Sequence, residues 1–532
     1  MSKKTVLGLL ALVLLFCLAV CVSAYEPEQF DGYPYDDQPD AVIEKDVIVV
    51  MGSSNFDPST SSGSYLQAVT KLFEEQNPNI DVKLNYGSWG DLWKKVGVML
   101  GNRQGPDIVI GPREYLFSQG RGGGQWEDIL TVPDEYFLDE LQKRAVGPAI
   151  LETSSFPGRE GYMVWPWTTY IDGTGVINAE LVRKAGYDPM EIRDNGWTVS
   201  QFLEISRRIA QDNDGDGKVD NFGAYAGQMG GGDAERLAFT SLFTHNVPYH
   251  LRYQDFPPFI DIKTGEKWID EEAWLKGLTA VQDIIYKEGV MPPNTVGVPG
   301  DEAREAFVTG KTLYIAAGPD ILTQVEERNR NIANGKEEGE PVEALVVPRP
   351  HFDGEEWNEH PVRVFSYGYY HFKQEPYQGD AHTRNVFKFA KFLTSPVFQP
   401  LLAHNNSIPP DVRIYKGESS WFPGILGTGP NAEYMVSLAE IWQPRVGIYF
   451  QMALTSDMYD ALNKLWREVA IPNVEAVLLN KRTPEEALAN IKAEQDRIFD
   501  EIPLEHRLVE NAEAIFEDLE DYAEKTGQRI DW

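Results

Sequence analysis

The stretch Val47-Ile48-Val49-Val50-Met51-Gly52-Ser53-Ser54-Asn55 indicates the fold class of this chain of 532 residues. Its first five residues are all apolar, which is typical of a strand buried on both faces of a parallel sheet. Its last four residues are small or polar and follow directly where that strand would end. We therefore predict a buried strand whose carboxyl end opens into a polar loop.

Helical and strand patterns alternate after this strand. Apolar residues recur at helical spacing in 65–73 and again in 92–100, and strand patterns lie at 80–84 and 108–110. This β-α-β-α-β order predicts an open α/β sheet whose loops gather at one edge. In such sheets, ligands bind outside the carboxyl ends of the strands.

A second α/β region begins near Thr168. It contains a predicted strand at 176–178, and a helix over 179–185 that ends at Gly186. Thr198-Val199-Ser200-Gln201 is a capping box that predicts the start of another helix. The apolar run Leu313–Ala317 is a short strand candidate.

Three helices are predicted in the last third of the chain. The first carries the apolar positions Val386, Phe389, Ala390 and Leu393. The second begins at Thr483-Pro484-Glu485-Glu486, which combines an N-cap, a proline at the first position and a glutamate at the third. The last is expected to have on one face the residues Leu508, Ala512, Ile515, Phe516 and Leu519.

The N-terminus has the pattern of a secretory signal over residues 1–24. Lys3 and Lys4 precede an apolar run that ends in the small residues Ser23 and Ala24, which is the arrangement that a signal peptidase recognises. The only two cysteines, Cys17 and Cys21, lie inside it. Either the signal is removed and the protein is freely secreted, or a lipobox-like Leu18–Cys21 makes Cys21 a lipid anchor in the membrane. Residues 25–44 are rich in proline, aspartate and tyrosine and suit a flexible tether.

The composition limits the partners. The chain has 42% hydrophobic and 12% aromatic residues and a net charge of −34, and loss of Lys3 and Lys4 would take that charge to −36. Such a surface repels phosphate backbones, so nucleic acid is not expected as a partner. The length predicts two or more domains.

The segment Asp212-Asn213-Asp214-Gly215-Asp216-Gly217-Lys218-Val219-Asp220 has the pattern of a calcium loop. Asp212, Asp214, Asp216 and Asp220 stand at positions 1, 3, 5 and 9, and Lys218 would contribute its carbonyl oxygen. Hard carboxylate oxygens suit a structural Ca²⁺ ion. The usual glutamate at position 12 is missing, because Gly223 stands there. The alternative is an acidic turn without metal.

Five segments together resemble one family, namely bacterial extracellular solute-binding proteins of the maltodextrin-binding type, which serve sugar ABC importers. In chain order the segments are Gly105–Val109, Thr174–Asp188, Gly310–Pro319, Phe389–Pro396 and Thr483–Phe499. The chain departs from the family at Asp320, where many members have an aromatic residue. The segment after Pro503 has no family role that we can assign.

The resemblance implies an α/β, two-lobed periplasmic-binding-protein-like fold of type II, with segments that cross a hinge. Its implied parts are lobe 1 (45–166 and 350–405), lobe 2 (167–349 and 406–502) and a C-terminal helical extension (503–532). Such a protein is exported to the periplasm or cell surface. It captures a carbohydrate between its lobes without chemical change and delivers it to the membrane subunits of an ABC importer, so no catalytic residues are expected.

Aromatic rings that stack on sugars, and polar groups that bond to hydroxyls, are expected in the loops between the lobes. The candidates are Asn55, Tyr86, Trp89, Arg113, Trp165, Trp167, Tyr170, Asp320, Tyr367, Trp442 and Arg445. For each aromatic residue the alternative is core packing.

Two other functions remain open on the sequence alone. A secreted glycosidase-like enzyme would also have an aromatic cleft, with two carboxylates as its catalytic pair. The same fold can also bind a non-sugar solute.

Overall fold

The computed structural model describes part of the chain: residues 43–53, 61–87, 89–112, 129–140, 142–143, 146, 151, 154–155, 160–172, 174–210, 219–225, 259–292, 295–296, 298, 300–316, 321–354, 363–395, 398, 431 and 453–526. The predicted signal, Cys21 and all of the tether except residues 43–44 lie outside these ranges. No helix within them is both long and apolar enough to cross a membrane.

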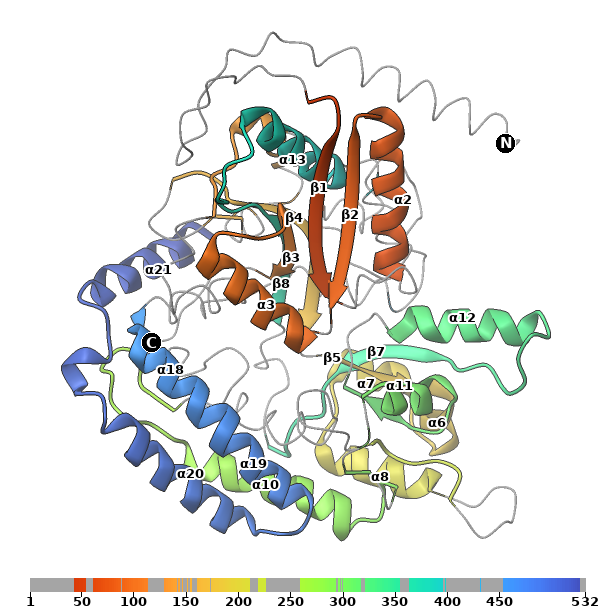
Figure 1. Cartoon of the computed structure of the whole chain (residues 1–532). Coiled ribbons are helices and arrows are strands. Elements are labelled where there is room, and N and C mark those ends of the chain that lie inside the picture. The colour runs from red at the N-terminus through yellow and green to blue at the C-terminus, as the bar shows by residue number, and fades with distance from the viewer. Residues whose placement is uncertain are drawn as a thin grey trace.

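The first lobe is built on a five-stranded sheet (Figure 1). Its strands, in spatial order, are β2 (Ile80–Gly87), β1 (Asp46–Ser53), β3 (Ile108–Pro112), β8 (Arg363–Tyr370) and β4 (Val164–Asp172). β1 pairs in parallel with β2 and β3, and β8 runs antiparallel to β3 and β4. The β-α-β-α-β prediction is therefore confirmed, and a strand that returns from late in the chain completes the sheet.

Helices cover both faces of this sheet, which explains why the run Val47–Met51 of β1 is apolar. Ile48 and Val50 are buried in a cluster with α2 (Ser61–Gln76) and α13 (Asp380–Leu393). Met51 packs against a second cluster that includes α3 (Trp89–Asn102). A short 3-10 turn, η4 (Asp134–Tyr136), lies against α13.

The second lobe contains a three-stranded sheet. β5 (Thr174–Asn178) lies between β6 (Tyr314–Ile315) and β7 (Ala344–Pro348) and is antiparallel to both. All five β5 residues are buried. The helices around it are α6 (Ala179–Lys184), α7 (Pro189–Asn195), α8 (Val199–Ile209), α11 (Gly300–Val308) and α12 (Ile321–Ala333).

The predicted helix starts in this lobe are confirmed. Asn178 caps α6, and the capping box of Thr198 and Gln201 at α8 is present in both directions. Phe202, Ile205 and Ile209 of α8 are buried. The predicted strand at 313–317 is shorter than expected, since β6 covers only Tyr314 and Ile315.

A helical layer completes the second lobe and leads to the C-terminus (Figure 1). Its elements are α10 (Glu271–Tyr286), α18 (Ser456–Lys464), the π-helix η7 (Leu465–Ala470), α19 (Ile471–Leu478), α20 (Pro484–Phe499), η8 (Leu504–His506) and α21 (Ala512–Thr526). The capping box of Thr483 and Glu486 is formed at α20. The prediction that Leu508 shares the face of the last helix is wrong. α21 begins only at Ala512, and Leu508 instead pairs with Leu454 in an isolated bridge.

The chain crosses between the lobes at the ends of β4 and β8. β4 stays in the first sheet as far as Asp172, and β5 of the second sheet begins at Thr174. The first crossing therefore lies later than the boundary expected after Pro166. On the return, His351 still bonds to the backbone of Trp197 and Val199 in the second lobe, and β8 begins at Arg363.

Candidate ligand-binding site

The carboxyl ends of β1, β2 and β3 meet at one edge of the first sheet. Ser53 lies opposite Gly87, and Met51 lies opposite Val109 near the end of β3. In Figure 1 this edge points toward the second lobe. Ligands of open α/β sheets bind at such an edge.

β4 and β8 extend beyond the rest of the sheet at the same edge. β3 ends at Pro112, which pairs with Tyr367, but the β4–β8 pairing continues as far as Asp172 and Arg363. This two-stranded ribbon leads directly into β5 of the second lobe. Both a hinge and a ligand contact are therefore expected here, because the ribbon is the part of the first sheet nearest the other lobe.

The structure brings the backbone positions of four predicted ligand residues to this edge. Tyr86 lies near the end of β2, and Trp89 begins α3 just after it. Tyr170 pairs with Phe365 in the ribbon, and Tyr367 pairs with both Pro112 and Thr168. Of these four, the side chain described is that of Tyr86, which is half-buried against the core of the first lobe.

Five other predicted ligand residues lie outside the described residues: Asn55, Arg113, Asp320, Trp442 and Arg445. Asn55 and Arg113 follow β1 and β3 closely in sequence, so they remain predictions for the same edge.

Trp165 and Trp167 lie in the core of the first lobe. Their exposed fractions are 0% and 1%. Trp165 donates its indole N–H to the carbonyl of Tyr136 at 2.8 Å and packs against Phe387. Trp167 stacks on Tyr65, with ring centroids 6.1 Å apart. Core packing therefore accounts for both rings, and neither presents a face to a ligand in this structure.

The predicted calcium loop follows α8, as expected, but of its segment Asp212–Asp220 only Val219 and Asp220 are described. Asp220 is half-buried, and its neighbour Asn221 donates its amide to the carbonyl of Gly310 at 3.1 Å. Asp212, Asp214, Asp216 and Lys218 lie outside the described residues.

The structure explains why glycine occupies position 12 of that loop. A Cβ atom on Gly223 would lie 2.4 Å from the Ser206 hydroxyl oxygen, and Ser206 is buried on α8. A glutamate cannot fit at this position, so a bound ion would need its last carboxylate from elsewhere. In the described part of the chain, no three acidic, histidine or cysteine residues are arranged to hold a metal.

A buried charge network at the opposite edge of the first sheet was missed by sequence reasoning. His382 of α13 bonds through Nδ1 to Asp46 at 2.7 Å and through Nε2 to Asp107 at 3.0 Å. Asp107 belongs to the Gly-Pro-Asp segment and also accepts a bond from the Val49 N–H at 2.8 Å. The network joins the start of β1, the start of β3 and the returning helix α13. No spacing signal could reveal it, because its members are far apart in sequence.

The network fixes the protonation of its members. Burial lowers the pKa of His382, but the hydrogen bonds and negative charges of Asp107 and Asp46 outweigh this and raise it to about 9. Burial raises the pKa of Asp46, but the bonds from His382 and Asn385 outweigh it and lower that pKa. Burial lowers the pKa of the neighbouring His371 to about 4. His382 is therefore charged and His371 neutral at pH 7.

The fold and the gathered strand ends define a two-lobed binding protein. The chain belongs to the bacterial extracellular solute-binding protein family, whose sequence model matches residues 57–400. The resemblance seen in the sequence is thus confirmed.

Solved structures of the same fold are similar over most of the chain. The GacH receptor of Streptomyces glaucescens, solved free and with acarbose, is 15% identical, with a TM-score of 0.58, and the match covers 86% of this chain and 100% of that one. The maltose/maltodextrin-binding domain of Bdellovibrio bacteriovorus, bound to maltotriose, is 15% identical, with a TM-score of 0.59 and coverage of 85% and 100%. A substrate-binding protein of Listeria monocytogenes in complex with cycloalternan is 17% identical, with a TM-score of 0.57 and coverage of 86% and 99%. At these identities the likeness establishes the two-lobed fold.

Proposed function

We propose that this protein captures an oligosaccharide between its two lobes and delivers it, chemically unchanged, to the membrane subunits of an ABC importer. The observation that carries the proposal is family membership combined with the strand edge, where four aromatic positions gather beside the crossing ribbon. Structural neighbours solved with acarbose, maltotriose and cycloalternan support a saccharide as the ligand class.

Capture would work by a shift between open and closed arrangements of the lobes. A ligand that contacts both lobes favours the closed state by the difference between its affinities for the two states. The first lobe would contribute Trp89, Tyr170 and Tyr367 as stacking surfaces, with Asn55 and Arg113 as hydroxyl partners. Asp320, Trp442 and Arg445 would contact the ligand from the other side.

Isothermal titration calorimetry with maltotriose, acarbose and a panel of other oligosaccharides tests this proposal. We expect saturable binding of at least one saccharide, weakened about tenfold or more by Tyr367→Ala. Tyr286→Ala is the matched control, because Tyr286 is an exposed tyrosine of α10 and should leave affinity unchanged. Release of shorter sugars during the titration would favour an enzyme instead, and binding only of non-sugar solutes would assign another ligand class.

We also propose a structural Ca²⁺ ion in the loop from Asp212 to Asp220. Its carboxylate spacing supports a hard cation, and the loop end is tied to the second lobe through Asn221. A calcium chelator should lower the melting temperature of the native protein, and Asp214→Asn should abolish that difference. An unchanged melting temperature would support the metal-free turn.

We propose, finally, that the chain is exported and that residues 1–24 are its signal. Mass spectrometry of the mature N-terminus in the native host distinguishes the two forms. A chain that begins near Tyr25 indicates free secretion, and a lipid on Cys21 indicates an anchor in the membrane.

A further inference from the structure

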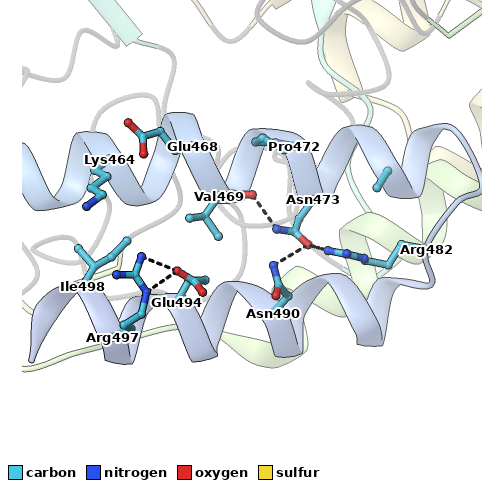
Figure 2. Close-up of a pocket in the computed structure, with 11 residues that line it drawn as sticks. Lys464, Glu468, Val469, Pro472, Asn473, Arg482, Asn490, Glu494, Arg497 and Ile498 are labelled. Carbon is cyan, nitrogen blue, oxygen red and sulfur yellow. Dashed lines mark hydrogen bonds and ion pairs between the residues drawn. The ribbon is translucent and has the colours of Figure 1, made fainter.

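A groove lies between two helical segments of the second lobe, among the elements that follow residue 453 (Figure 2). One wall is formed by α18, η7 and α19, and the other by α20. Its volume is about 410 Å³, which lies within the range of small-molecule sites. It is separate from the strand edge described above, so a function here goes beyond the proposed saccharide capture.

The wall of the groove contains a π-helical turn with an identifiable cause. Pro472 has no N–H to donate to the carbonyl of Glu468, four residues earlier. The helix widens before it, and the Ile471 N–H bonds back to Trp466, five residues earlier. The side chain of Asn473 donates to the Val469 carbonyl at 2.7 Å. Such widened turns occur often at functional sites.

The same buried asparagine holds an arginine at one end of the groove. Asn473 is 4% exposed, and its carbonyl oxygen accepts bonds from Arg482 and, at 3.3 Å, from Asn490. Within the described residues, this is the one partner that the Arg482 guanidinium has. A guanidinium carries five N–H donors, so most of them remain available to a ligand.

The charge of the groove is opposite to that of the whole chain. Arg497 is paired with Glu494 at 2.7 Å, which leaves Lys464, Arg482 and Glu468 as the other lining charges and gives a local excess of one positive charge. Lys464 has no ion pair in the described part of the chain. Figure 2 places Lys464 and Arg482 at opposite ends of the groove. In a chain with a net charge of −34, this concave surface offers an anion one cationic side chain at each end, where the local charge opposes the repulsion by the rest of the chain.

We propose that this groove is a second ligand site that takes an elongated small organic anion with a carboxylate at each end. Arg482 binds one carboxylate, since guanidinium groups bond carboxylates in a fixed fork. Lys464 binds the other as a point charge. Asn473 is a positioning residue that orients Arg482.

Binding of linear dicarboxylates to the full chain tests the proposal. Titration calorimetry at low ionic strength would compare suberate with the shorter succinate and with octanoate, which has one carboxylate. We expect saturable binding of suberate, and weaker binding of the other two. Arg482→Gln should weaken suberate binding roughly tenfold or more, since a hydrogen bond to a charged group is lost.

Two further variants keep the test decisive. Lys464→Gln changes an exposed side chain and should weaken suberate binding at least about threefold, even if Arg482→Gln fails to fold. Lys481→Gln is the matched control, because Lys481 is an exposed neighbour of Arg482 that does not line the groove. Absence of saturable suberate binding, or equal weakening by all three variants, would overturn the proposal.

Discussion

In each lobe, a buried cationic side chain bonds a segment from late in the chain to the rest of that lobe, but the two cations are of different kinds. In the first lobe, His382 of the returning helix α13 lies between the carboxylates of Asp46 and Asp107. In the second, Arg507 holds the approach to α21 through three uncharged carbonyls, those of Ile502, Gly265 and Phe499. Histidine and carboxylates titrate, whereas arginine keeps its charge at all ordinary pH values. The late segment of the first lobe is therefore held by a contact that depends on pH, and that of the second lobe by a contact whose charge does not change with pH.

The largest effect is expected from removal of the first-lobe cation. His382→Ala would leave two buried carboxylates without the positive charge that lies between them, because Asp46 and Asp107 are 6% and 2% exposed. We expect a loss of about 3 to 5 kcal/mol in the free energy of unfolding, measured by urea titration at pH 7. His506→Ala changes an exposed histidine and should have little effect. A loss below about 1 kcal/mol for His382→Ala would show that the network contributes little to the stability of the first lobe.

The pH dependence of stability sharpens the same comparison. The pKa of His382 is raised in the folded state to about 9, so its contribution is full below its unfolded pKa of about 6.5 and is lost as pH rises through 9. The loss from pH 6 to pH 10 is expected to be about 3 kcal/mol. His371 acts in the opposite direction, because its folded pKa is about 4. Its contribution is full above pH 6.5 and is lost as pH falls toward 4.

Urea titrations of the wild type and His382→Gln at several pH values measure this dependence. Wild-type stability should be greatest near pH 6 to 7, and the alkaline loss should be absent in the variant. An identical alkaline loss in both proteins would contradict the assignment of charge to His382.

The contribution of Arg507 to the free energy of unfolding is expected to be smaller than that of His382 and independent of pH. Arg507→Met removes the donors to three carbonyls but also removes a buried charge, since Arg507 is 6% exposed. We expect a loss of about 2 kcal/mol, with the same value at pH 6 and pH 9 by chemical denaturation. A loss that changes with pH would mean that a carboxylate shares this site.

Removal of a helix N-cap is expected to have the smallest effect on stability. α13 begins at Gly379 without a side-chain cap, whereas α20 begins with a complete capping box at Thr483. Thr483→Ala should cost about 1 kcal/mol of stability, and Thr483→Ser should retain most of it, as thermal unfolding would show. Equal melting temperatures for Thr483→Ala and the wild type would show that this cap does not limit stability.

Local sequence signals predicted the elements and their order well. The apolar run at 47–51, the helical stripes and both capping boxes depend on near neighbours, and they appear in the structure, except that Leu508 lies before the last helix and not on it. The boundary between the lobes was expected after Pro166, whereas β4 stays paired with β8 of the first sheet as far as Asp172. That pairing partner lies about two hundred residues further along the chain, so no local pattern contains it.

The candidate site was predicted less completely, for a related reason. Trp165 and Tyr170 lie on the same strand, and their residue type alone does not distinguish core from ligand contact. Packing against Tyr136 and Phe387, which are distant in sequence, places Trp165 in the core. The network of His382 was missed for the same cause. Contacts between segments that are distant in sequence determine both the burial of Trp165 and the network of His382. No residue spacing in a single sequence indicates such contacts.

Small-angle X-ray scattering of the full chain, with and without a saturating oligosaccharide, tests most directly whether the two lobes close on a solute. We expect the radius of gyration to fall when the saccharide binds, with no change in the saccharide itself. Saturable binding with an unchanged radius of gyration would contradict capture by closure.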